Sequence, residues 1–342
     1  MASAAQPTPD TTMRAITQDT YGSADVLRLA RIPRPEPGKN QVLVRVHAAG
    51  LDRGVWHLMT GRPYVARLAL GLRRPRTSVP GSDVAGTVVA VGAGVSELSA
   101  GDEVFGEGRS TFAEYAVARA DRLVRKPAGL TFEQAAVVPV SGVTALQGLR
   151  DVGRLERGQT VLITGASGGV GSYAVQLDKA FGAEVTGVCS TAKVDFVRSL
   201  GADHVLDYTR EDFADGAHYY DLILDVAGNP PLSRLRRALT PSGTAVITGG
   251  EEGSDLGGGL HRQLGALVLS PFVRQRLAAF VGIVRASDLV QLTEFLEAGI
   301  VTPPLDRTFP LDQAPEALRY LAAGKARGKV AITIRPQPRT AR

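Results

Sequence analysis

Two patterns of hydrophobic and polar positions divide the chain. Between residues 13 and 128, short apolar and β-branched runs are separated by Gly and Pro, and they lie at 41–47, 86–92, 102–105 and 112–117. Runs of this length and spacing predict the strands of a compact, mostly antiparallel β barrel. Residues 1–12 are polar and contain proline, so we expect them to form a flexible tail.

Beyond residue 160, apolar runs of strand length alternate with segments of helix length. The predicted strands lie at 160–164, 184–189, 204–207, 221–226 and 243–248. One helix is predicted directly after Gly168, and two more are predicted at 192–200 and 231–239. This alternation predicts an α/β domain with a parallel sheet covered by helices on both faces, which is the doubly wound dinucleotide-binding fold. A later helix is predicted at 288–298 and a last strand at 329–334, whereas the glycine-rich residues 251–260 have no predicted structure.

The sequence TGASGGVG, residues 164–171, lies between the first of these strands and its helix. Glycines at such a bend permit positive φ and let backbone N–H groups approach a phosphate at the helix N-terminus. The spacing matches the dinucleotide fingerprint, except that alanine stands in place of the first glycine. Taken alone, the loop could equally be a structural turn. With its flanking elements it predicts cofactor contacts from Ala166, Ser167, Gly168, Gly169 and Val170.

Length, charge and cysteine content restrict the remaining possibilities. A chain of 342 residues exceeds the usual size of one hydrophobic core, so we expect two domains. The net charge of +5 is spread along the sequence, and we expect no nucleic-acid partner. Cys189 is the single cysteine, which excludes an intramolecular disulfide and a four-thiolate zinc site and predicts a reducing, cytoplasmic compartment. No uncharged apolar run approaches the roughly 18 residues of a membrane span, so we expect no membrane partner.

Longer motifs carry a resemblance to a known family. In chain order they are VRVHAAGLD (44–52), PGSDVAGTVVAVG (80–92), GDEVFG (101–106), FAEYAV (112–117), VSGVTALQGL (140–149), GASGGVG (165–171), LGADHVLDY (200–208) and GKARGKVAITI (324–334). Together they resemble the zinc-independent medium-chain dehydrogenase/reductases, in the branch of quinone oxidoreductases and enoyl reductases.

The resemblance implies two domains with the active cleft between them. A GroES-like β-barrel catalytic domain is expected at residues 13–130 and 285–342, and a Rossmann domain that binds NADPH at 131–284. A capping-box spacing from Thr131 to Gln134 marks the expected boundary. The family commonly dimerises through the edge of the Rossmann sheet, so a homodimer is expected.

The residues that hold zinc in related enzymes are replaced in this chain. Zinc-dependent relatives use a cysteine in the loop that here ends at Asp52, and a histidine followed by glutamate where this chain has Ser82 and Asp83. Because two ligand types are missing, we predict no metal site. A weak oxygen-rich site from Asp52, Asp83 and His57 is the alternative, although nothing in the spacing supports it. The loss of a Lewis acid favours substrates such as quinones and conjugated enones, which accept hydride directly.

The end of the second predicted strand determines the expected form of the cofactor. NAD-binding domains place Asp or Glu there to bind the ribose 2′-OH. This chain instead has Ser190 and Thr191, followed by Lys193. A small hydroxyl leaves room for a 2′-phosphate, Ser190 can hydrogen-bond it and Lys193 supplies charge, so we predict NADPH. The alternatives are that Ser190 caps the following helix and that Lys193 is solvated.

The resemblance assigns further cofactor contacts. It implies that Tyr208 packs beside the 2′-phosphate, although a half-buried structural tyrosine is the alternative. It also implies that Thr144 lies near the nicotinamide, and that the loops containing Ala227, Gly249 and Gly250 follow the riboses. Lys325 and Arg327 could reach the cofactor from the C-terminal segment, but we expect solvent to surround them.

Two residues are candidates for proton transfer to the acceptor. Tyr64 matches a tyrosine that borders the substrate cleft in similar reductases, with a packed loop aromatic as the alternative. Asp52 replaces an asparagine that is common in zinc-free relatives. It donates a proton if desolvation raises its pKa, and otherwise accepts hydrogen bonds or pairs with Arg53 or Arg67.

The predicted function is NADPH-dependent, metal-free transfer of hydride to a quinone or an α,β-unsaturated carbonyl. A stand-alone enoyl reductase for polyketide or acyl thioester substrates shares this chemistry and is one alternative. The other is a protein that binds NADPH without turnover and serves as an interaction module.

Overall fold

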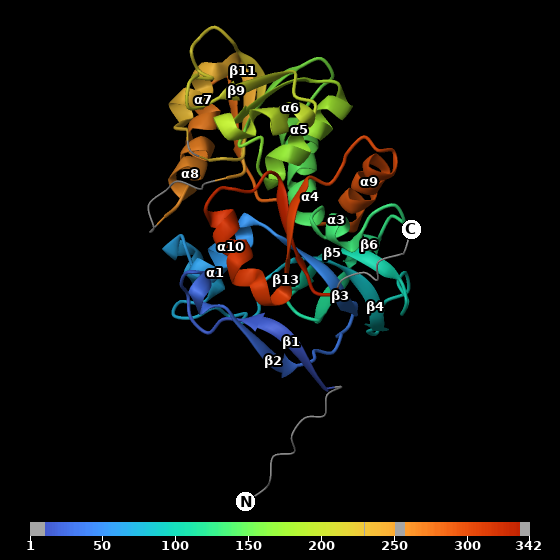
Figure 1. Ribbon diagram of the computed structural model, residues 1–342. Coiled ribbons are helices and arrows are strands. Elements are labelled where there is room, and N and C mark those ends of the chain that lie inside the picture. The colour runs from blue at the N-terminus through green and yellow to red at the C-terminus, as the bar shows by residue number, and fades with distance from the viewer. Residues whose placement is uncertain (1–10, 229, 250–256, 336–342) are drawn as a thin grey trace, which may run out of the picture.

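The computed structural model describes residues 11–228, 230–249 and 257–335 and divides them between two lobes (Figure 1). The lower lobe in Figure 1 contains the N-terminal strands together with the last elements of the chain. The upper lobe contains the middle of the sequence. This is the mixed α/β architecture that the two hydrophobic patterns predict.

The lower lobe is built on a six-stranded sheet in the order β13-β14-β3-β4-β5-β6. Its strands are β3 (Gln41–Leu51), β4 (Asp83–Val91), β5 (Glu103–Arg109), β6 (Tyr115–Arg125), β13 (Leu305–Pro310) and β14 (Lys329–Thr333). β3 also pairs with β6, which closes the sheet into the predicted barrel, and only β13 and β14 run parallel. The closed sheet surrounds side chains such as Val44, Val46 and Val84, which are fully buried.

A separate hairpin precedes the barrel. β1 (Thr12–Thr17) pairs with β2 (Arg28–Pro33) in antiparallel register. Thr12 therefore lies in a strand and not in the predicted tail, and residues 1–10 fall outside the described residues. Two short helices follow β3, namely α1 (Arg53–Thr60) and α2 (Arg67–Leu70).

The upper lobe is a parallel sheet in the order β12-β11-β10-β7-β8-β9. Its strands are β7 (Thr160–Thr164), β8 (Glu184–Cys189), β9 (His204–Asp207), β10 (Tyr220–Asp225), β11 (Leu239–Ile247) and β12 (Arg276–Ala279). The predicted strands and the doubly wound parallel sheet are confirmed. β11 begins four residues before the predicted strand, and β12 was not predicted.

Helices cover the parallel sheet and connect it to the barrel. They are α3 (Phe132–Ala136), α4 (Pro139–Gln147), α5 (Gly169–Phe181), α6 (Val194–Ser199), α7 (Leu232–Ala238), α8 (Leu260–Leu269) and α9 (Ala286–Glu297). Thr131 and Gln134 form the predicted capping box at the start of α3. α3 packs against β3, β4 and β14, so it lies on the barrel side of the chain. The division at residues 130 and 131 stays a prediction.

The C-terminal segment returns to the barrel. After α9 the chain forms β13, α10 (Ala314–Ala322) and β14, and β14 pairs antiparallel with β3. Val330 lies opposite Leu51, and Ile332 lies opposite Ala49. The barrel therefore needs both ends of the sequence, with the parallel sheet inserted between them.

Asp178 on α5 is a buried acid without a partner. Neither carboxylate oxygen forms a hydrogen bond within the described part of the chain, and burial raises the pKa of Asp178 well above its ordinary value of 3.8. The folded state keeps the proton that the unfolded state releases. The stability contributed by this group is therefore lost as pH rises above 3.8.

We predict that Asp178→Ala raises the free energy of unfolding at pH 7 by about 1–3 kcal/mol, because an unsatisfied buried polar group is removed. Melting temperatures of both proteins at several pH values test this. The advantage of the variant should shrink as pH falls towards 4. An equal or lower melting temperature for the variant at pH 7 would show that Asp178 has a compensating partner.

Candidate active site

The glycine loop lies where the carboxyl end of β7 meets the N-terminus of α5. Gly168 is the N-cap of α5, and no side chain caps this helix end. The first helical bond is donated by Ser172 to the carbonyl of Gly168, so the amides of the preceding turn point out of the helix. Free amides at a helix N-terminus favour an anion such as a pyrophosphate.

The left-handed turn of the loop falls one residue earlier than the fingerprint predicts. Gly165 has φ +67, whereas Ala166 is fully buried and donates its N–H to the carbonyl of Val188 at 3.1 Å. Alanine is therefore tolerated at position 166, because Gly165 makes the turn. Gly171 allows close packing, since a Cβ there would lie 2.2 Å from the carbonyl oxygen of Gly165.

A buried ion pair lies directly beneath this loop. Lys329 Nζ is 3.4 Å from Asp83 Oδ2, and both side chains are at most 1% exposed. The stem of Lys329 supports the loop, because a Cβ at Gly169 would lie 3.0 Å from its Cδ. The other oxygen of Asp83 accepts the N–H of Val140 at 3.0 Å, near the start of α4. The pair thus joins β4, β14, α4 and the glycine loop.

The pKa of Asp83 is shifted because its carboxylate is buried between Lys329 and Asp52. Burial is the largest influence and raises the pKa of Asp83 to about 7. Lys329 lowers it, and the neighbouring carboxylate of Asp52 raises it. Asp52 itself caps α1 by accepting the N–H of Val55 at 3.1 Å, and its second oxygen is buried without a hydrogen-bond partner in the described part of the chain.

These residues do not fit a zinc ion. Ser82 stands where zinc-dependent relatives have a histidine ligand, and the carboxylate of Asp83 is paired with Lys329. His57, the third member of the oxygen-rich alternative, has Nδ1 2.8 Å from the carbonyl of Arg62. No cluster of three or more potential ligands occurs within residues 11–228, 230–249 and 257–335.

The expected phosphate corner lies at the end of β8. Ser190 occupies the N-cap position of the turn at residues 191–193, but its side chain forms no capping hydrogen bond there. Lys193 is not merely solvated, because Nζ donates to the carbonyl of Ala326 at 2.7 Å. Arg327 reaches back as well and donates to the carbonyl of Ala192 at 3.3 Å. Tyr208 is 61% exposed beside this corner, so it is not the half-buried structural tyrosine of the alternative.

Sequence reasoning missed a carboxylate close to this corner. Asp207, the last residue of β9, accepts hydrogen bonds from the hydroxyl of Thr191 and from the N–H and hydroxyl of Thr209. The bond from Thr191 is the main reason that the pKa of Asp207 is low. One oxygen therefore holds the loop after β8, through Thr191, and the other holds the turn after β9, through Thr209. The sequence signal was the position of Asp207 just before Tyr208, at a strand end.

A second network supports the strand-end loop that contains Ala227. Asp225 accepts the hydroxyl of Thr164 at 2.6 Å and pairs with the buried Arg262 of α8 at 2.5 Å. Arg262 also donates to the carbonyl of Gly228, and Thr164 accepts the N–H of Ala227 at 3.2 Å. A Cβ at Gly249 would lie 1.8 Å from the carbonyl oxygen of Val226, so the two strand ends touch. Gly250 lies outside the described residues.

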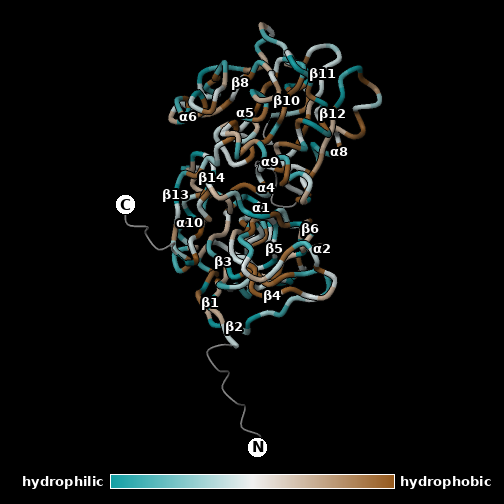
Figure 2. Tube along the Cα trace, turned by 90° about the vertical axis from the view of Figure 1, so that its right-hand side faces the viewer, coloured by the Kyte–Doolittle hydropathy of each residue, from teal (hydrophilic) through white to brown (hydrophobic). Residues whose placement is uncertain are grey.

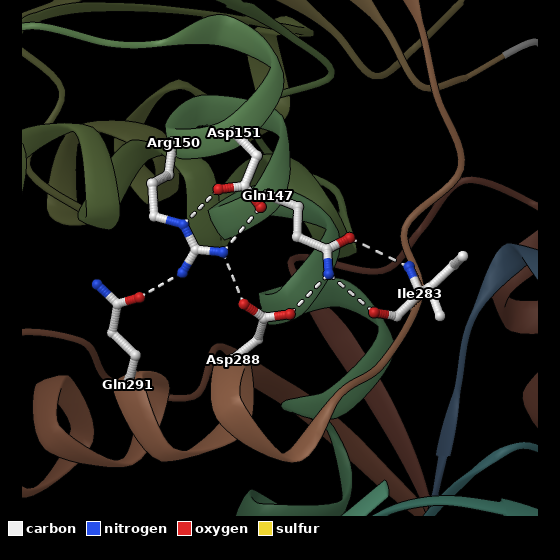
Figure 3. Close-up of polar contacts among 6 residues, drawn as sticks. All are labelled: Gln147, Arg150, Asp151, Ile283, Asp288 and Gln291. Carbon is white, nitrogen blue, oxygen red and sulfur yellow. Dashed lines mark hydrogen bonds and ion pairs between the residues drawn. The ribbon is translucent and has the colours of Figure 1, made fainter.

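Thr144 is held on α4 next to an irregular segment that follows β12. Its hydroxyl donates to the carbonyl of Val140 at 2.7 Å, and a Cβ at Gly282 would lie 2.4 Å from the same hydroxyl. Figure 3 shows how the neighbouring Gln147 fixes this segment through both backbone groups of Ile283. Gln147 also donates to Asp288, which pairs with Arg150 at 2.7 Å.

Tyr64 lies in a helical turn just before α2. Its ring is 40% exposed and faces the guanidinium of Arg67 at 4.6 Å from the ring centroid. Its hydroxyl forms no hydrogen bond within the described part of the chain. Arg67 donates to the carbonyls of Gly61 and Thr60 and forms no pair with Asp52. The adjoining Pro63 contacts Gly258, just before α8, so this segment reaches the other lobe.

Comparison with known proteins identifies the family. Residues 38–128 match the family described as alcohol dehydrogenase GroES-like domain, and residues 200–332 match the family described as zinc-binding dehydrogenase. A chloroplast envelope quinone oxidoreductase homolog from Arabidopsis thaliana is 33% identical over 94% of this chain and 98% of its own length. The chain belongs to the medium-chain dehydrogenase/reductase superfamily, in its quinone oxidoreductase-like branch.

Two further matches agree with this membership. An NADPH-dependent alkenal/one oxidoreductase from Arabidopsis thaliana is 34% identical over 94% of this chain and 79% of its own length. The quinone oxidoreductase from Coxiella burnetii superposes with a TM-score of 0.83 at 29% identity, covering 95% of this chain and all of that one. This medium-chain family member is an oxidoreductase with a nicotinamide cofactor, and its lower lobe is the GroES-like domain.

We predict that Lys329→Met lowers the free energy of unfolding by about 3–5 kcal/mol at pH 8, because Asp83 is left buried without its cation. The pKa of Asp83 then rises further, so the folded state releases its proton only at higher pH. The deficit should therefore grow as pH increases above 7. Chemical denaturation between pH 6 and 9 measures it. The double variant Lys329→Met, Asp83→Asn should recover most of the loss, and a deficit independent of pH would refute the coupling.

Proposed function

We propose that this oxidoreductase uses NADPH, without a metal ion, to reduce quinones or α,β-unsaturated carbonyl compounds. The observation that carries the proposal is the combination of the glycine loop with a lysine and a serine, and no free carboxylate, at the end of β8. The names of similar proteins, which include quinone and alkenal/one oxidoreductases, support the acceptor class.

NADPH would supply the hydride. The residues of the chain would bind and orient the cofactor and the acceptor and would shield them from water. The amides at the start of α5 would hold the pyrophosphate, with contacts from residues 166–170. Ser190, Lys193 and Tyr208 would hold the 2′-phosphate, and Lys193 would exchange its bond to Ala326 for the phosphate. Thr144, Ala227, Gly249 and Gly250 would line the riboses and the nicotinamide.

Tyr64 is the proposed proton donor to the acceptor oxygen, because its hydroxyl has no hydrogen-bond partner in the described part of the chain and the residue is partly exposed. Asp52 is the second candidate, through the buried carboxylate oxygen that has no hydrogen-bond partner in the described part of the chain. A quinone or enone needs no Lewis acid, because the charge that arrives with hydride is delocalised.

The domain limits, compartment and assembly follow the sequence predictions. We keep the GroES-like domain at 13–130 and 285–342 and the Rossmann domain at 131–284. We keep the reducing, cytoplasmic setting on the ground that Cys189 is the single cysteine of the chain. No described helix is both long and apolar enough to cross a bilayer.

We also propose a homodimer that forms along β12, the edge strand of the parallel sheet. Large apolar side chains are exposed around this edge, namely Leu264, Leu267, Val268, Phe272 and Val281. An open strand edge beside an exposed apolar patch is typical of an association surface. We predict that sedimentation velocity detects a dimer and that Val281→Lys converts it to a monomer. A monomeric parent protein at micromolar concentration would exclude the proposal.

Oxidation of NADPH with a panel of acceptors tests the reaction. We predict turnover with a small quinone or a simple enone in the presence of a chelator, and weaker turnover with an acyl thioester. A strong preference for the thioester would favour the enoyl reductase alternative. Loss of activity on chelation would contradict the metal-free mechanism.

The same panel tests Tyr64. Tyr64→Phe should lower kcat/KM for enones by about 10–100-fold, within the range expected for general acid catalysis, while the Kd for NADPH stays the same. Unchanged kinetics would remove Tyr64 from the mechanism.

Lys193→Ala tests the form of the cofactor. The variant should bind NADPH at least about tenfold more weakly than the parent protein, because a charge-assisted bond to the 2′-phosphate is lost. Its affinity for NADH should fall by less than about twofold. Fluorescence titration with each nucleotide measures both constants. Lys179→Ala is a suitable control, since Lys179 is bonded to Asp203 on the same domain. Equal weakening of both nucleotides would refute the assignment of the phosphate corner.

A further inference from the structure

Residues 58–78, here called the basic lobe, are a segment of the lower lobe whose charged side chains are all positive. The lobe includes α2 and contains five arginines but no aspartate or glutamate. Arg62, Arg73, Arg74 and Arg76 are exposed. Arg73 and Arg74 form no ion pair within the part of the chain that the structure describes. The lobe therefore presents uncompensated positive charge to its surroundings.

The base of the basic lobe is held firmly. Tyr21 donates its hydroxyl to the carbonyl of Gly71 at 2.7 Å, and Arg67 lies over the Tyr21 ring at 4.4 Å. The N–H of Arg76 donates to the carbonyl of Leu70 at 2.8 Å, which closes residues 70–76 into a compact tip. The tip is thus a fixed projection from the GroES-like domain.

This projection exposes large apolar side chains. Leu68 is 68% exposed and Leu72 at the tip is 69% exposed. Arg73 and Arg74 follow Leu72 directly. Figure 2 shows α2 at the outer edge of the lower lobe, on the side opposite α10 and β13. An extended flat surface can therefore approach this edge.

Exposed leucines flanked by arginines match the chemistry of an anionic lipid bilayer. Apolar side chains enter the boundary between headgroups and acyl chains, and arginines pair with headgroup phosphates. A nucleic acid would use the arginines but would leave the leucines in water. The combination of both residue types at one projecting tip favours the lipid surface.

We propose that the basic lobe docks this protein onto bilayers that contain anionic phospholipids, with Leu68 and Leu72 in the interface and Arg73, Arg74 and Arg76 on the phosphates. This revises the expectation of no membrane partner. That expectation rested on the lack of a long apolar run, and peripheral docking needs no such run. Tyr64 belongs to the same lobe, so docking turns the proposed acceptor site towards the phase in which apolar quinones dissolve. Only this last consequence rests on the proposed function.

Co-sedimentation of the full-length protein with vesicles tests the docking. The vesicles are phosphatidylcholine alone or phosphatidylcholine with about one third phosphatidylglycerol. The variant Leu72→Ser, Arg73→Ser is compared with Arg28→Ser, Leu29→Ser on β2. Each pair removes one exposed leucine and one adjacent exposed arginine, so net charge and hydropathy change equally. Melting temperatures confirm that both variants are folded.

We expect binding to the anionic vesicles only, and we expect about 0.5 M salt to reduce it by screening. The Leu72→Ser, Arg73→Ser variant should lose at least about fivefold in bound fraction, and the β2 variant should bind like the parent. Equal losses in both variants would assign binding to overall charge and overturn the proposal. Absence of binding to anionic vesicles would overturn it as well, leaving an acidic protein as the partner to be sought. Neither result depends on reductase activity.

Discussion

Asp83 and Lys329 are 246 residues apart in the sequence, yet their side chains form a buried ion pair beneath the glycine loop. Isolated buried charges are costly, so each member of the pair requires the other to be in place. Asp83 also accepts the amide of Val140, and Lys329 supports Gly169 from below. The return of the C-terminal segment to the barrel and the position of the glycine loop are therefore set together.

The site above this pair is built from strand ends and backbone groups, and few charged side chains take part. Asp225 and Asp207 are both fully bonded to protein groups, so they act as supports for loops. The positive groups Lys193 and Arg327 instead bridge the end of β8 and the C-terminal segment. Binding of a phosphorylated ligand at this corner would replace bonds to backbone carbonyls with stronger bonds to an anion.

Much of the fold could be predicted because its signals are local. The alternation of strands and helices and the glycine loop depend on residues close together in sequence, and these predictions are confirmed. The strands β12 and β13 and the hairpin of β1 and β2 were missed. Neither β2 nor β13 contains a fully buried residue, so these two strands lack the apolar run that marks a strand in a sequence. The left-handed turn at Gly165 was missed because the fingerprint assigns it to the next position.

The supports of the site could not be predicted from one sequence. The pairs Asp83 with Lys329 and Asp225 with Arg262 join segments far apart in the chain, and no spacing rule connects them. The exposure of Leu68 and Leu72 could not be predicted either, because the sequence alone does not distinguish an exposed leucine from a buried one. Roles could be proposed for Ser190, Lys193 and Tyr64 from residue type and place in the sequence, because each of these residues follows or belongs to a recognisable strand or motif.

A crystal structure of the protein with NADPH tests the central claim most directly. The account predicts the pyrophosphate on the amides of residues 169 and 170 and the 2′-phosphate within hydrogen-bond distance of Ser190 Oγ and Lys193 Nζ. Lys193 should then have left the carbonyl of Ala326, and the ion pair of Asp83 and Lys329 should be intact. A 2′-phosphate in contact with solvent alone, or a metal ion bound by Asp52 and Asp83, would contradict the account.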